Sequence, residues 1–141
     1  MNKENFYKIS VIGQGFAGFP MSVVLANSKT FLKLKNFHVL GVEKNNKAGN
    51  IIKDKINKGI LPFDNNDKKL KFIFRKSIKK KNYSVTTNIN DIIDSNVVII
   101  SINFDFKNKN TIKNIKKIFQ ELVKIIDKKT APKPVGVKKT W

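Results

Sequence analysis

Three glycines with the spacing Gly-x-Gly-x-x-Gly constrain the fold of this chain more than any other feature. Gly13, Gly15 and Gly18 directly follow a strand-like run, YKISVI at residues 7–12, and precede an apolar stretch at residues 19–26. The first run has the length of a buried strand, and the second suits a helix with a proline in its first turn. The glycines therefore predict a strand, a tight turn and a helix in succession.

Each glycine has a mechanical role if this turn binds a dinucleotide. The first allows the sharp turn, the second lets the backbone approach a pyrophosphate, and the third lets the helix pack closely on the strand. Free N–H groups at the start of the helix would attract the phosphates. Such a triplet can also be a plain turn, but only seven glycines occur in the chain and three lie at this junction. The candidate cofactor-binding residues of the turn are Gly13, Gln14, Gly15, Phe16, Ala17 and Gly18.

Glu43 is the candidate for the second part of a dinucleotide site. It ends a predicted strand at residues 37–43, in the place where an acidic side chain accepts hydrogen bonds from the adenosine ribose. A carboxylate there would repel a 2′-phosphate, which favours NAD over NADP, although Lys44 and Lys47 soften that discrimination. The alternative is an ordinary solvated glutamate at the end of a strand.

The rest of the chain alternates helical and strand patterns, which is typical of a parallel sheet with right-handed crossovers. Helices are predicted at residues 46–58 (ending before Gly59), from the cap Asp67 to residue 78, briefly after Asn88, and at 111–126, with strands at 83–86 and 97–102. The last strand is a continuous apolar run, as expected for burial on both faces. We therefore expect an α/β, Rossmann-like, doubly wound parallel sheet of about four strands in the order 3-2-1-4. The NAD-binding domain would span residues 1–126, and residues 127–141 would form an irregular, disordered tail.

Composition narrows the function classes. The net charge of +19 raises nucleic acid as a partner, but 28 of the 29 basic residues are lysines scattered along the chain, and only Arg75 could supply a guanidinium fork. A basic nucleic-acid-binding protein stays open as an alternative that only the charge favours. The chain has no cysteine, which excludes thiolate metal sites and cysteine nucleophiles within it.

The sequence gives no clear sign of a metal site, a catalytic residue or a membrane-spanning segment. His38, the only histidine, lies in a predicted strand and is interpreted as a sheet residue, so no metal site and no catalytic residue are predicted. No apolar run has the roughly 20 residues of a membrane span, and residues 1–7 carry no signal-peptide core, so we expect a cytoplasmic protein without a membrane partner.

Three segments together resemble the N-terminal domain of the UDP-glucose/GDP-mannose dehydrogenase family. They are VIGQGFAGFPMSVVLA at residues 11–26, FHVLGVEKN at 37–45 and INKGILPF at 56–63. The more specific parts are Gly-x-Pro-Met at residues 18–21 and Asn-Lys-Gly-x-x-Pro at 57–62, and the resemblance covers roughly residues 8–126.

The resemblance implies an NAD-dependent oxidation of the C6 alcohol of a nucleotide sugar to a uronate for polysaccharide biosynthesis, with a UDP-N-acetylhexosamine as plausible a substrate as UDP-glucose or GDP-mannose. The family's covalent cysteine lies in a later domain and is missing here, so this chain alone is expected to be inactive.

Asn103 and Phe104 stand where the family has Pro-Thr, and Ala48 where it often has a basic residue. The tail replaces the family's fifth strand, so the chain is interpreted as truncated, with a possible self-association through the exposed sheet edge. A non-catalytic NAD-binding relic is the other alternative.

Overall fold

The computed structural model describes residues 6–28, 37–104 and 107–130. The chain divides into two units, residues 1–104 and 105–141, and each is described here by itself. The first unit contains, in chain order, β1 (Tyr7–Ile12), α1 (Gly18–Asn27), β2 (Phe37–Val42), α2 (Lys47–Asn57), α3 (Lys68–Lys80), β3 (Tyr83–Thr86), the short 3₁₀ helix η1 (Ile89–Asp94) and β4 (Val97–Ile100). The second contains α4 (Lys109–Thr130).

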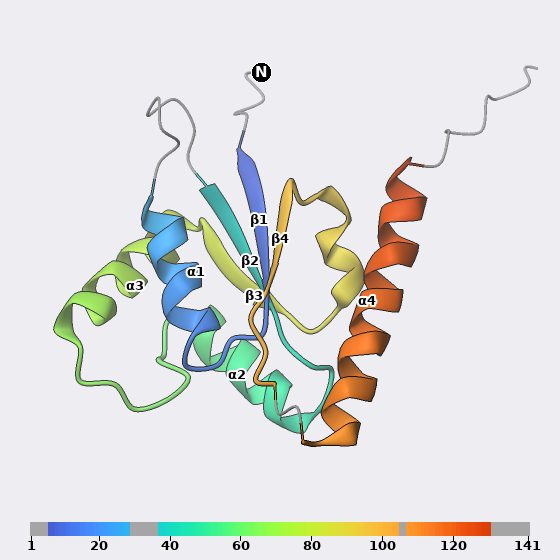
Figure 1. Ribbon diagram of the computed structural model, residues 1–141. Coiled ribbons are helices and arrows are strands. Elements are labelled where there is room, and N and C mark those ends of the chain that lie inside the picture. Colours follow the sequence, from blue (N-terminus) through green and yellow to red (C-terminus); the bar gives the residue numbers. More distant parts are fainter. Residues whose placement is uncertain (1–5, 29–36, 105–106, 131–141) are drawn as a thin grey trace, which may run out of the picture. The chain divides into compact units, whose positions relative to one another are not determined.

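The sheet confirms the predicted topology. All four strands are parallel and lie in the order β3-β2-β1-β4, so β1 is an inner strand, with β2 and β4 as its neighbours (Figure 1). β1 pairs with β2 along its whole length, Tyr7 opposite Phe37 and Ile12 opposite Val42. The carboxyl ends of the strands therefore meet at one edge, which is where ligands bind in open parallel sheets.

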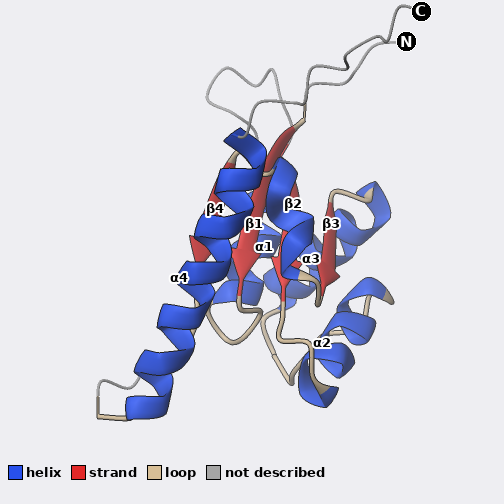
Figure 2. Ribbon diagram, turned by 90° about the vertical axis from the view of Figure 1, so that its right-hand side faces the viewer, coloured by secondary structure: helices blue, strands red, loops and turns tan. Residues whose placement is uncertain are grey.

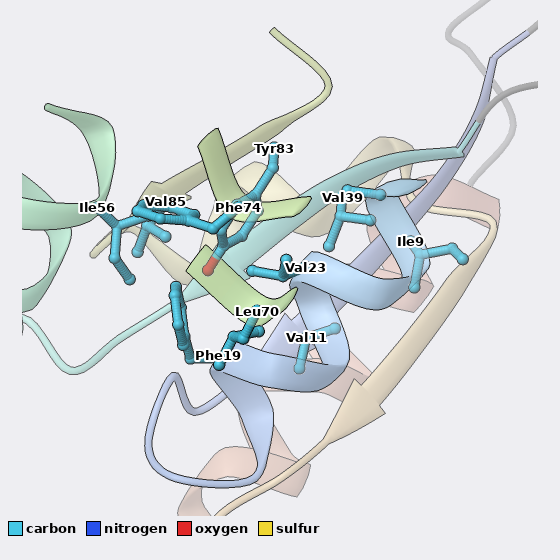
Figure 3. Packing of buried hydrophobic residues seen from close by; sticks show 11 residues of the cluster. Ile9, Val11, Phe19, Val23, Val39, Ile56, Leu70, Phe74, Tyr83 and Val85 are labelled. Carbon is cyan, nitrogen blue, oxygen red and sulfur yellow. The ribbon is translucent and has the colours of Figure 1, made fainter. Parts of the chain in front are cut away.

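Helices lie on both sides of the sheet in the first unit. In Figure 1, α1 and α3 lie on one side and the short η1 segment on the other, as expected for a doubly wound sheet. Figure 2 shows the four strands side by side in the order β4, β1, β2, β3. The main core fills the space between the sheet and α1 and α3. It is formed by aliphatic and aromatic side chains that include Ile9, Val11, Phe19, Val23, Val39, Ile56, Leu70, Phe74, Tyr83 and Val85 (Figure 3).

Side-chain caps fix the starts of three helices, two of them as predicted. Asp67 accepts hydrogen bonds from the backbone amides of Lys69 and Leu70, at 2.8 and 3.0 Å, and so starts α3. Asn46 and Asn88 cap α2 and η1 in the same way. Gly59 follows α2 with a φ of +75°, the left-handed conformation expected of a glycine after a helix.

The carboxyl-terminal part of the first unit differs from the prediction. β4 ends at Ile100, two residues before the apolar run does, and its burial on both faces is not observed, since Val97 and Val98 are each 39% exposed. β4 is an edge strand of the sheet, so only one side of it pairs with a neighbour. The edge position agrees with the predicted strand order, but the continuous apolar run did not indicate burial on both faces here.

α4 extends beyond its predicted end. The expected helix over residues 111–126 is observed, but it continues to Thr130, so residues 127–130 are helical rather than irregular. The rest of the predicted tail, residues 131–141, lies outside the described residues. In the described part of the chain, no helix is both long enough and apolar enough to cross a membrane.

Candidate functional site

Gly13 makes the turn at the end of β1. Its φ is +93°, and its amide donates to the carbonyl of Val42 at 2.8 Å, so the strand pairing continues up to the point where the backbone turns. A Cβ at this position would lie 2.1 Å from the backbone oxygen of Ser101. Both the left-handed conformation and the lack of space therefore require glycine here.

Gly18 allows α1 to begin directly against this turn. A Cβ on Gly18 would lie 1.8 Å from the carbonyl oxygen of Gly13 and 3.4 Å from the Cβ of Ser101. The nearest obstacle is backbone, which cannot move aside without separating α1 from β1. The third glycine thus has the packing role expected from the spacing.

Gly15 differs from the other two glycines because a Cβ there would meet no protein atom within 4 Å. The open space on this side of the turn is the one that a bound pyrophosphate would need. Within the described part of the chain, no hydrogen bond satisfies the backbone amides of Phe16, Ala17 and Gly18, and the side chain of Ala17 offers none to cap α1. Three unpaired donors at a helix N-terminus beside an open glycine form a cradle for an anion.

Glu43 lies beside this cradle, directly after β2. Its Oε1 accepts a hydrogen bond from the backbone amide of Gln14 at 2.5 Å, and its Oε2 accepts one from the amide of Lys44 at 3.2 Å. Each carboxylate oxygen has a second lone pair, so both can still accept from a ligand hydroxyl. The structure therefore brings the predicted acid together with the predicted turn.

Gln14 is placed differently from the rest of the turn. Its side chain is completely buried, and its Nε2 donates to the carbonyl of Val11 at 2.8 Å while its Oε1 accepts from the hydroxyl of Tyr83 at 2.6 Å. The carboxamide points into the core and not toward the open side of the turn. Sequence reasoning placed Gln14 in the turn but missed this burial.

Ser101 is a neighbour of the turn that sequence reasoning also missed. Its amide donates to the carbonyl of Ile12 at 2.7 Å, and its backbone covers Gly13 at the junction between β1 and β4. Crossovers leave β1 toward β2 on one side and arrive at β4 on the other, so this junction is the topological switch point of the sheet. Asn103 and Phe104 are exposed in the loop just beyond.

An aromatic row extends from the turn into the core. Phe16 is 80% exposed and its ring centroid lies 4.7 Å from that of Phe63, in the loop before α3. Phe63 in turn lies 5.5 Å from Phe19, and Phe19 lies 5.2 Å from Phe74. Phe63, which directly follows the Asn-Lys-Gly-x-x-Pro segment, thus packs against Phe16 of the glycine turn, although the two are far apart in sequence.

The described residues contain no candidate metal-binding site. No group of three or more His, Cys, Asp or Glu residues among them is arranged to hold a metal ion. His38 lies within β2, as predicted, with its ring centroid 4.0 Å from that of Phe6.

Comparison with known proteins agrees with this geometry. The family described as "UDP-glucose/GDP-mannose dehydrogenase family, NAD binding domain" matches residues 7–140. A search of curated protein sequences gave no significant match.

Solved structures with the same fold include three nucleotide-sugar dehydrogenases. One is an NDP-N-acetyl-D-galactosaminuronic acid dehydrogenase from Methanosarcina mazei Go1 (TM-score 0.66, 24% identity, covering 79% of this chain and 24% of that one). Another is a GDP-mannose dehydrogenase from Pseudomonas aeruginosa (TM-score 0.67, 22% identity, 87% and 26%). The third is a UDP-D-ManNAc dehydrogenase from Pyrococcus horikoshii (TM-score 0.57, 16% identity, 91% and 34%). At these identities the likeness establishes the fold, and the chain spans about a quarter to a third of the length of these proteins.

Proposed function

Since the chain belongs to the UDP-glucose/GDP-mannose dehydrogenase family and matches its NAD-binding domain, we propose that residues 13–18 and Glu43 form the NAD site of a nucleotide-sugar 6-dehydrogenase. Residues 1–126 would act as the NAD-binding domain. NAD, when bound, supplies the hydride acceptor for oxidation of a sugar C6 alcohol toward a uronate. The observation that carries the proposal is the cradle at Gly15, which is open and faces unpaired amides.

Each group in the cradle has a defined task. The amides of Phe16, Ala17 and Gly18 donate to the pyrophosphate oxygens, and the partial positive charge at the start of α1 stabilises the same negative charge. Glu43 accepts hydrogen bonds from the adenosine ribose hydroxyls, and its carboxylate would repel a 2′-phosphate, so NAD is preferred over NADP. The nicotinamide half would lie at the carboxyl ends of β1 and β4, beside the switch point at Ser101.

The substrate would be a nucleotide sugar of the UDP-glucose, UDP-N-acetylhexosamine or GDP-mannose type, bound by parts of a dehydrogenase that these 141 residues do not include. We expect the chain by itself to produce no NADH with any of these sugars, because it has no cysteine to hold an aldehyde-level intermediate. An NADH absorbance assay with purified chain tests this, and sustained turnover would contradict it.

Calorimetric titration of the chain with NAD tests the site. The wild type should bind, whereas Gly15→Val should lose binding, since its side chain would occupy the open space that the phosphates need. The thermal midpoint of Gly15→Val should stay close to that of the wild type, because no protein atom is displaced. Phe72→Ala, at an exposed position on α3, is the control and should bind NAD normally. Unchanged affinity in folded Gly15→Val would refute the site.

Salt separates this proposal from the nucleic-acid alternative. NAD held by backbone amides should bind with little dependence on salt, whereas binding of a nucleic acid by scattered lysines should weaken steeply as salt is added. A chain that binds DNA or RNA in this salt-dependent manner and shows no affinity for NAD would favour the alternative.

A further inference from the structure

The buried carboxamide of Gln14 connects the core to the glycine turn. It lies between β1 and Gly41, near the end of β2, where it donates a hydrogen bond to the carbonyl of Val11 and accepts one from the hydroxyl of Tyr83. Only a side chain that both donates and accepts can satisfy these two partners at once, and a carboxamide does so without charge. The side chain therefore has a specific fit that the turn spacing alone does not demand.

Gly41 provides the space for this carboxamide. A Cβ on Gly41 would lie 2.6 Å from the Cδ of Gln14 and 2.9 Å from its Nε2. Gly41 is in the interior of a strand, where glycine costs stability. The glycine and the glutamine are thus the two sides of one contact between the turn after β1 and strand β2.

Tyr83 holds the other side of the carboxamide. The ring is buried at the start of β3, among Val23, Phe74 and the rest of the core (Figure 3). Burial raises the pKa of Tyr83 well above its usual range, the Ser22 hydroxyl opposes the rise, and the nearby Glu43 carboxylate adds to it. The phenol is therefore held in its protonated form, in which it donates to Gln14.

The backbone of the same residue reaches the proposed ribose site. The Gln14 amide donates to Oε1 of Glu43 at 2.5 Å, so the orientation of that peptide group determines where the carboxylate lies. The Gln14 side chain is held by Val11, Tyr83 and Gly41, so its peptide group cannot rotate freely. The contacts of the Gln14 side chain with Gly41 and Tyr83 are thereby coupled to the position of the Glu43 carboxylate.

We propose that Gln14 is a positioning residue for cofactor recognition: its buried carboxamide, seated over Gly41 and held by Tyr83, orients the Gln14 amide that aims the Glu43 carboxylate at the adenosine ribose. This inference rests on the proposed function. It assigns to Gln14 no contact with the cofactor, but an effect exerted through Glu43.

A double-mutant cycle tests the coupling. Gln14→Met keeps the size of the side chain and removes its hydrogen bonds. We expect it to lower NAD affinity about tenfold, which is the effect of losing roughly one hydrogen bond between the Glu43 carboxylate and the ribose. In a Glu43→Ala background the same substitution should change affinity less than about twofold, because the carboxylate that Gln14 positions is gone. An equal loss in both backgrounds would mean a general structural effect and would overturn the inference.

Tyr83→Phe is a milder second variant in case Gln14→Met folds poorly. It removes only the hydroxyl that donates to Gln14, and it should lower NAD affinity by about threefold, again only when Glu43 is present. Tyr7→Phe is the matched control, since Tyr7 is the other tyrosine and lies at the opposite end of β1. A similar loss in Tyr7→Phe would overturn the inference.

Amide hydrogen exchange without any cofactor separates this inference from the proposed function. The backbone amide at position 14 should be protected in the wild type and should exchange at least about tenfold faster in Gln14→Met and in Glu43→Ala. Unchanged protection in Gln14→Met would refute the positioning role even if NAD binds. If exchange is faster in Gln14→Met than in the wild type but the wild type does not bind NAD, the proposed function alone is refuted.

Discussion

Gly18→Ala should destabilise the first unit severely, although it adds only one methyl group. The new Cβ would lie 1.8 Å from the backbone oxygen of Gly13, whereas ordinary contacts of this kind are 3.4 Å or longer, so α1 and the turn must separate by about 1.6 Å. α1 contributes Phe19 and Val23, both fully buried, to the core, and this shift would loosen their packing.

The magnitude follows from these contacts. Overpacking against fixed atoms costs about 1–3 kcal/mol, and because the obstacle here is backbone we expect the upper end, about 3 kcal/mol. For a domain of about 100 residues this corresponds to a fall in the thermal midpoint of roughly 12–24 °C. Circular dichroism during thermal unfolding measures it directly.

Gly15→Ala is the matched control for this prediction. The same methyl group is added three residues earlier in the same turn, where no protein atom lies within 4 Å, so the free energy of unfolding should stay within about 0.5 kcal/mol of the wild type. A midpoint for Gly18→Ala within about 3 °C of the wild type, or equal losses in the two variants, would refute the reasoning.

Three further predictions concern stability. Asp67→Ala removes the cap of α3 and should cost about 1 kcal/mol in urea unfolding. Asn57→Ala should cost about 1–3 kcal/mol in the same assay, because the Asn57 carboxamide bonds both the N–H and the C=O of Val85, each at 2.8 Å. The raised pKa of Tyr83 keeps its hydroxyl neutral in the folded state, whereas the same hydroxyl ionises in the unfolded state. The free energy of unfolding should therefore fall as pH rises above about 10, and denaturant titrations of Tyr83→Phe should show a smaller fall.

Local patterns were sufficient for most of the fold. β1, the glycine turn and α1 could be predicted because each requirement, an apolar run, a turn and a helical stretch, is satisfied within about 20 consecutive residues. The caps Asp67 and Asn88 and the helix terminus at Gly59 were predictable for the same reason, since their partners lie within a few residues. The strand order followed from the handedness of crossovers in parallel sheets.

Long-range contacts explain what the sequence did not reveal. The burial of Gln14 depends on Gly41 and Tyr83, which belong to two other strands, and no local signal connects them. An interior strand glycine is the one hint, since it often marks a close approach by another group. Phe63 reaches the turn only through the fold. The exposure of Val97 and Val98 in β4 was also not predicted, because an apolar run does not reveal how completely other elements cover the faces of a strand.

The different demands on the three turn glycines have an evolutionary consequence. Gly13 and Gly18 are required by the fold itself, so any descendant that still folds must keep them or move α1. Gly15 is not required by packing, and a lineage that no longer used the cofactor could replace it freely. Substitution at Gly15 with the other two glycines intact would therefore mark a relic that has kept its fold and lost its ligand.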